Sequence, residues 1–225
     1  RRAAARALIV VLAPGQVETF IKSAFLDVPK ADANTLHGIL MQIKALVDAY
    51  PNIIEGIKSD VEKLLRTAID NHEKSYIRLY FYINLADIFG LIDIVKPVLL
   101  ALFSNVPALL KRPYGQRILV IIFKIMTEKE LLQVIISHNH VTLFHACRFL
   151  AANPSYIKNM ISRALIDIFL QEPVPAVYDR ILKLLINFPE KFQPNDFQKK
   201  QFNDMILKDM NQARLMPLLR VASMF

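Results

Sequence analysis

Apolar residues recur at helical spacing along nearly the whole chain. Between residues 17 and 26, for example, Val17, Phe20, Ile21 and Ala24 repeat at i, i+3, i+4 and i+7 and therefore share one face of a helix. Short turn signals rich in proline, glycine and asparagine interrupt this pattern at regular intervals. The pattern requires no strands, and it predicts an all-α protein.

The turn signals divide the chain into a series of predicted helices. Their approximate ranges are 1–12, 17–26, 32–50, 53–69, 74–89, 91–103, 106–111, 114–126, 128–137, 141–152, 155–170, 176–187, 196–210 and 212–222. The third begins near Asp32 or Asn34, either of which is a good N-cap, and Thr127 and Glu130 have the spacing of a capping box. Because most connections are short, successive helices are expected to be antiparallel neighbours.

The spacing of these helices also predicts their architecture. Helix pairs that recur about every 35–45 residues without a strict sequence signature are typical of HEAT and armadillo repeats. We therefore expect a HEAT/armadillo-like α-solenoid of antiparallel helix pairs, with residues 1–225 forming a single segment of a longer chain. Residues 188–195, which contain two prolines, are the expected elbow. A single globular helical domain is the alternative.

Composition narrows the protein class. The chain is 54% hydrophobic with only 5 glycines, which suits a helical protein, and its one cysteine, Cys147, rules out a disulfide within the chain and favours a reducing compartment. A mean hydropathy of +0.31 raises the question of a membrane protein. In the most apolar stretch, residues 83–110, charged residues and two prolines interrupt any run long enough to span a bilayer. We expect no membrane insertion.

Motifs that carry chemistry are missing from the sequence. His138, His140, His145 and Cys147 are close in sequence, but their spacing matches no standard zinc pattern. There is no glycine-rich phosphate loop, nucleophile elbow or HExxH motif, and Cys147 has no motif around it. We therefore expect no catalytic residue, no metal site and no cofactor, and we predict that the chain is not an enzyme.

Positive charge is the more informative feature, since the formal net charge is +8. The basic residues gather in three places: Arg1, Arg2 and Arg6; Lys111, Arg112 and Arg117; Lys199 and Lys200. Turns on one edge of a solenoid line up, so such clusters can follow a phosphate backbone, and the nearby Tyr114 and Phe197 can stack on bases or pack in the core. The alternative is that these residues only make the surface soluble.

Two segments near the N-terminus together resemble the THADA family of large helical-repeat proteins. One is an Ala- and Arg-rich helix, and the other is the segment Asn34 to Ile43. The residues that match the family pattern are Arg2, Ala5, Arg6, Ala7, Leu8, Asn34, His37, Gly38, Leu40 and Gln42. The resemblance covers roughly the first 80 residues, and the rest of the chain resembles the family only in its helical character.

This resemblance implies a function. It implies a cytoplasmic scaffold that partners an FtsJ-type methyltransferase in 2′-O-methylation of the tRNA anticodon loop, with the methyl donor and the catalytic residues supplied by the enzyme. Animal members are also linked to calcium-pump regulation. The alternative function is a protein-binding adaptor, such as a transport receptor or a calcium-pump regulator, that does not contact RNA.

The motif residues Asn34, His37, Gly38 and Gln42 are expected to be structural. A glycine inside a helix costs about 1 kcal/mol relative to alanine. Gly38 therefore predicts that a neighbouring helix approaches closely at that point. His37 and Gln42 point to different sides of the helix, where they can bond the adjacent repeat or a partner.

Overall fold

The computed structural model describes residues 2–137, 139–171, 174–208, 217, 219 and 221–223, and for residues 2, 4–6 and 208 it describes the backbone alone. Every regular element in these ranges is a helix, and they contain no strand, so the all-α prediction is confirmed. The chain divides into two compact units, Arg1–Leu119 and Val120–Phe225. The predicted elbow at 188–195 contains a 3-10 turn, η2 (Pro189–Lys191), and stays a prediction.

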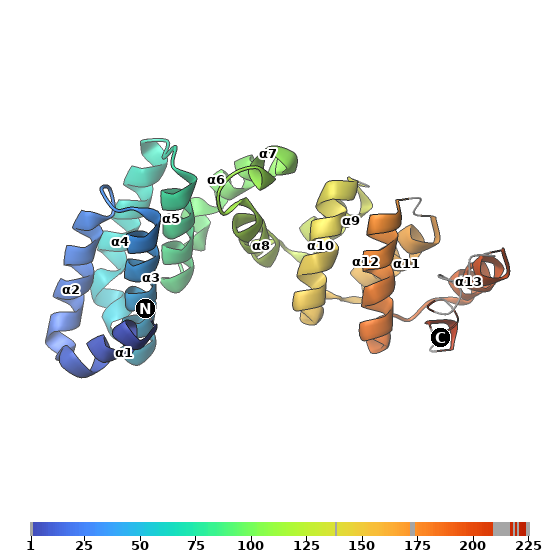
Figure 1. The fold of residues 1–225 in the computed structure, drawn as a ribbon, viewed down its shortest axis with the longest axis horizontal. Coiled ribbons are helices and arrows are strands. Elements are labelled where there is room, and N and C mark those ends of the chain that lie inside the picture. The colour runs from blue at the N-terminus through green and yellow to red at the C-terminus, as the bar shows by residue number, and fades with distance from the viewer. Residues whose placement is uncertain are drawn as a thin grey trace. The chain divides into compact units, whose positions relative to one another are not determined.

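The first unit consists of helices that pack in two rows (Figure 1). Its elements are α1 (Arg2–Val11), α2 (Pro14–Asp27), α3 (Ala33–Ala49), α4 (Ile53–Asp70), α5 (Tyr76–Ile88), α6 (Ile92–Phe103), α7 (Val106–Leu110) and the start of α8 (Gly115–Ile125). One row is α1, α3 and α5, and the other is α2, α4 and α6, so each of these six helices contacts its next-but-one neighbour in the sequence.

Apolar side chains fill the space between the two rows. Ile21, Ile43, Ile57, Leu65 and Ile83 are completely buried, and they come from helices of both rows. Burying side chains of this size stabilises the fold by about 1.5–3 kcal/mol each. The helical periodicity of the sequence therefore corresponds to a buried face on α2, α3, α4 and α5.

Capping side chains fix where several of these helices begin. The Asp32 carboxylate accepts a hydrogen bond from the Thr35 backbone N–H at 2.7 Å, so Asp32 and not Asn34 is the N-cap of α3. The Asn105 side chain accepts one from the Ala108 N–H at 3.1 Å and starts α7. Each such bond satisfies a backbone donor that the first helical turn leaves without a partner.

The second unit has the same kind of packing. Its further elements are α9 (Glu128–Ile136), α10 (His140–Ala152), η1 (Pro154–Tyr156), α11 (Asn159–Gln171), α12 (Pro175–Asn187), η2 and α13 (Asp196–Lys208). Helix α11 contacts both α9 and α13, while α10 contacts α12. The predicted capping box is confirmed, because the Thr127 hydroxyl accepts from the Glu130 N–H at 3.2 Å and the Glu130 carboxylate accepts from the Thr127 N–H at 2.7 Å.

One predicted helix was wrong at its start. The sequence predicts a single helix over 155–170, but the structure has the short turn η1, and α11 begins only at Asn159. The break directs Tyr156 inward, where its ring lies 4.9 Å from that of Phe149 and its hydroxyl donates to the Lys124 carbonyl at 3.3 Å. The predicted helix over 212–222 lies largely outside the described residues.

No helix in the described ranges combines the length and the apolar character of a membrane span.

Candidate nucleic-acid interface

A tight turn between α7 and α8 carries the central basic cluster of the sequence. The Gly115 N–H donates to the Arg112 carbonyl at 3.0 Å, and Tyr114 has a φ of +61°. With Pro113 in second position, this is the arrangement of a type II turn, which normally has glycine where Tyr114 stands. Only glycine fits at position 115, because a Cβ there would collide with the Leu109 carbonyl oxygen.

Tyr114 lies against a tyrosine of α5. The rings of Tyr80 and Tyr114 are stacked, with centroids 4.8 Å apart and planes at 15°. Tyr76 and Tyr80 are four residues apart on α5, so they share one face of that helix. All three rings are half-buried. The turn therefore extends a short row of tyrosines that begins on α5.

Two exposed arginines of this turn lie over the tyrosine rings. The Arg112 guanidinium is 5.5 Å from the ring centroid of Tyr76, and the Arg117 guanidinium is 5.4 Å from that of Tyr114 and 6.0 Å from that of Tyr80. Each contact of this kind stabilises by about 0.5–1 kcal/mol at an exposed site. We call Tyr76, Tyr80, Arg112, Tyr114 and Arg117 the Arg–Tyr cluster.

The charge of the Arg–Tyr cluster is not neutralised within the described part of the chain. Neither Arg112 nor Arg117 forms an ion pair with a described carboxylate, whereas Arg66 and Arg78 do. Lys111, the C-cap of α7, is exposed beside them. The turn therefore presents three cations, two of them held in place by aromatic rings.

His37 of the N-terminal motif lies next to this cluster. A hollow of about 10 Å³ has His37, Tyr80 and Tyr114 in its wall. A volume of this size holds at most a single water molecule, so the contact is packing and not a ligand site. Asn34 is exposed at the start of α3, and Gln42 is half-buried further along it. The structure thus joins one motif residue to the basic turn.

The expectation for Gly38 was wrong. No described atom lies within 4 Å of a Cβ built at this position, apart from its chain neighbours and the backbone of its own helix. The neighbouring helices pack against the larger side chains of α3, such as Leu36 and Ile43, which are buried, while Gly38 is half-exposed. The close approach that requires a glycine is at Gly115 instead.

The other predicted basic residues belong to other parts of the chain. Lys199 and Lys200 lie on α13 in the second unit, where Lys200 is exposed and the neighbouring Phe197 is 68% exposed. Arg1 and the side chains of Arg2 and Arg6 lie outside the described residues. The sequence did not single out Tyr76 and Tyr80; their four-residue spacing is the signal that could have indicated them.

The cysteine and histidines of α10 have ordinary helical surroundings. Cys147 is buried, and the His145 ring packs edge-on against that of Phe144 at 5.4 Å. Partial burial, with a smaller effect of the Arg148 charge, lowers the pKa of His145. Within the described residues no group of three or more His, Cys, Asp or Glu side chains is arranged to hold a metal ion. His138 lies outside those residues.

No family model, curated protein or solved structure matches this chain. The similarity to the THADA family therefore has only the motif residues behind it.

Proposed function

We propose that this chain is a non-catalytic scaffold of the HEAT/armadillo type that binds RNA through the Arg–Tyr cluster. The packing of helices against their next-but-one neighbours in α1–α6 and in α9–α13 supports the solenoid part of this proposal, since stacked repeats contact only their neighbours. The observation that carries the RNA part is the pair of arginines, unpaired among the described carboxylates, that rest on tyrosine rings.

The Arg–Tyr cluster suits a phosphate backbone for two physical reasons. A planar guanidinium offers several N–H donors in a fork that matches phosphate oxygens, and stacking on a ring leaves the edge of that fork available. A side chain that already rests on a ring also loses less conformational freedom on binding. The neighbouring tyrosine faces add surfaces on which unpaired bases stack, at about 1–3 kcal/mol per base.

The kind of RNA comes from the resemblance to the THADA family. On that basis we propose tRNA as the nucleic acid and an FtsJ-type methyltransferase as the protein partner, in the cytoplasm. The enzyme would then supply the methyl donor and the catalytic residues for 2′-O-methylation of the anticodon loop. This chain would hold the tRNA in position, which requires charge and shape but no chemistry of its own.

The test is binding of a fluorescently labelled tRNA to the 225-residue chain over a series of salt concentrations. We expect the Arg112→Glu/Arg117→Glu variant to bind more weakly and to lower the log–log salt slope by about 1–2, since each lost phosphate contact removes ~0.7–0.9. The matched control is Lys30→Glu/Lys63→Glu, which changes the net charge equally at exposed positions of the same unit. If both variants reduce binding equally, the Arg–Tyr cluster is not the RNA site.

The second candidate function is a protein-binding adaptor, such as a transport receptor or a calcium-pump regulator, that does not contact RNA. An open apolar cleft of about 660 Å³ in the first unit favours it. The ratio of absorbance at 260 nm to that at 280 nm, measured after a high-salt wash, separates the two. An adaptor would carry no nucleic acid before or after the wash.

A further inference from the structure

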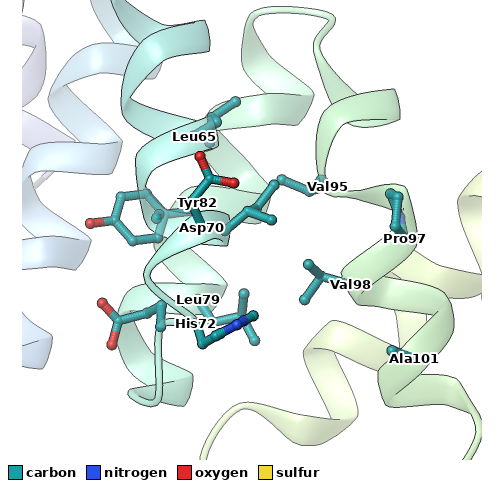
Figure 2. A pocket seen from close by; sticks show the side chains of 12 residues that line it. Leu65, Asp70, His72, Leu79, Tyr82, Val95, Pro97, Val98 and Ala101 are labelled. Carbon is teal, nitrogen blue, oxygen red and sulfur yellow. The ribbon is translucent and has the colours of Figure 1, made fainter.

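An open cleft lies between the end of α4, the start of α5 and helix α6 (Figure 2). Its volume is about 660 Å³, and all of its lining residues belong to the first unit. Several of its lining side chains are small, among them Ala68 of α4 and Val98 and Ala101 of α6. Leu65 and Tyr82, both buried, form its floor. The cleft is therefore apolar along most of its length.

One end of the cleft has an unusual backbone. His72 has a φ of +47°, in the left-handed region where glycine is the usual residue. Its N–H donates to the Ile69 carbonyl at 2.9 Å, and the Glu73 N–H donates to that of Ala68 at 3.1 Å. These two bonds make a Schellman motif at the end of α4. Figure 2 shows the His72 side chain extending into the cleft opposite Val98 and Ala101.

The same end of the cleft is acidic. Asp70 is exposed in the last turn of α4, where the carbonyl groups of the helix add negative charge, and it forms no ion pair with a described residue. Glu73 is already paired with Arg78, at 2.8 Å between Oε2 and Nε. None of the residues that line the cleft is a lysine or an arginine. Asp70 is therefore the one carboxylate of the cleft lining that no described cation neutralises, and a cationic side chain of a partner would complement it.

We propose that this cleft binds a short amphipathic helix of a protein partner, with apolar side chains against Ala68, Val98 and Ala101 and a lysine or arginine beside Asp70. A small molecule fits less well, because such sites enclose most of their ligand, and here Asp70, His72, Pro97 and Ala101 at the rim are all exposed. An extended strand also fits less well, because the described elements around the cleft are helices that offer no sheet edge for it to pair with.

The occupant is a helix for a geometric reason. A helix presents side chains at i, i+3, i+4 and i+7 along one stripe, and grooves between helices accept such a stripe. A basic residue at one end of that stripe reaches Asp70 while the apolar residues occupy the cleft. This inference does not depend on RNA binding, because none of the residues of the Arg–Tyr cluster lines the cleft.

The experiment selects helix-favouring peptides of about 16 residues from a displayed library on the 225-residue chain, a length of about four turns. Affinities of the selected peptides are then measured by fluorescence anisotropy. We expect peptides with an apolar stripe and a terminal lysine or arginine. Val98→Phe, which fills the cleft, should weaken them at least about tenfold. Leu100→Phe on the same helix, outside the cleft and 42% exposed, should leave binding unchanged and is the matched control.

A charge swap tests the basic residue separately. Asp70→Lys should weaken the basic peptides about fivefold or more, and a peptide with glutamate in place of its basic residue should recover binding to that variant. The variant should fold, because a cation suits the end of a helix. If Val98→Phe does not fold, as judged by circular dichroism, Ala101→Leu fills the cleft from an exposed position instead.

Several outcomes would overturn the proposal. One is a library with no enrichment over a blank surface. Another is a set of enriched peptides that bind Val98→Phe and Ala101→Leu with the same affinity as the wild type. A third is an affinity that does not change with the charge at position 70. Binding of a small apolar dye that Val98→Phe abolishes, with no enriched peptide, would assign the cleft to small molecules. Loss of RNA binding in the Arg–Tyr variants would leave the cleft proposal unaffected.

Discussion

Replacing His72 by glycine removes a side chain from a backbone position that disfavours it. His72 is the residue after the C-cap of α4, with a φ of +47°, and its backbone N–H is bonded to the Ile69 carbonyl at 2.9 Å. A residue with a Cβ pays about 1–2 kcal/mol for this conformation, whereas glycine adopts it freely. The His72 side chain is exposed, so its removal loses little packing.

The net effect is the difference between that relief and the cost of glycine in the unfolded chain. Glycine loses about 0.5–1 kcal/mol more on folding than other residues, so we expect His72→Gly to stabilise the protein by up to about 1 kcal/mol. For a unit of this size that is a rise of about 3–5 °C in melting temperature. Thermal unfolding followed by circular dichroism measures it.

Asn71→Gly is the matched control, because Asn71 is the adjacent residue and has a φ of −81°. Glycine gives no relief at that angle, so this variant should destabilise by about 0.5–1 kcal/mol. The reasoning fails if His72→Gly lowers the melting temperature as much as Asn71→Gly does. That result would mean that contacts of the imidazole stabilise the fold by more than the left-handed backbone conformation destabilises it.

Two further predictions concern single residues. Gly115→Ala should destabilise the first unit, because the new Cβ would meet the Leu109 carbonyl oxygen. Gly38→Ala should stabilise the same unit by about 1 kcal/mol, because no described atom lies within 4 Å of the new Cβ outside its own helix backbone and chain neighbours, and alanine favours a helix. Urea unfolding of the two variants checks which glycine a neighbouring segment approaches closely. Arg78, which donates to Glu73, holds the pKa of Glu73 below its ordinary 4.5. A lowered carboxyl pKa stabilises the fold above pH 4.5, and this stabilisation is lost as the pH falls through the pKa that Glu73 has in the folded protein. Glu73→Gln should therefore lower the free energy of unfolding by about 1–3 kcal/mol at pH 7, and by progressively less below pH 4.5. A difference that stays constant from pH 7 to pH 3 would contradict this.

Periodicity and turn chemistry were sufficient to predict most of the helices but not the details of the sites. The capping box at Thr127 is a local pattern, so the sequence alone predicted it correctly. At the break before α11, the Tyr156 ring packs against Phe149 and its hydroxyl bonds the carbonyl of Lys124, which lies 32 residues earlier and carries no local signal. For the same reason the basic turn was predicted from Lys111, Arg112 and Arg117, while its tyrosine partners on α5 were not.

The cleft was missed for a different reason. An apolar groove forms where neighbouring helices carry small side chains, and in the sequence small residues such as Ala68 and Ala101 are indistinguishable from ordinary helix formers. The left-handed backbone conformation of His72 also has no signal in the sequence. Glycine or asparagine usually marks the end of a helix, so the sequence points to Asn71, the residue directly before His72. Sequence patterns therefore predict grooves between small side chains, and individual backbone angles, less well than they predict helices.

The two proposed binding surfaces have one helix in common, and this arrangement bears on how the proposed scaffold would act. On α5, Tyr76 and Tyr80 belong to the Arg–Tyr cluster, whereas Leu79 and Tyr82 line the cleft. At 3.6 residues per turn these two pairs point roughly 110° apart around the helix axis. An RNA on one pair and a partner helix beside the other would therefore not compete for the same side chains, yet both would rest on one rigid element. Holding a substrate and a protein at a fixed separation supplies proximity, which by itself lowers the barrier of a reaction carried out by the partner.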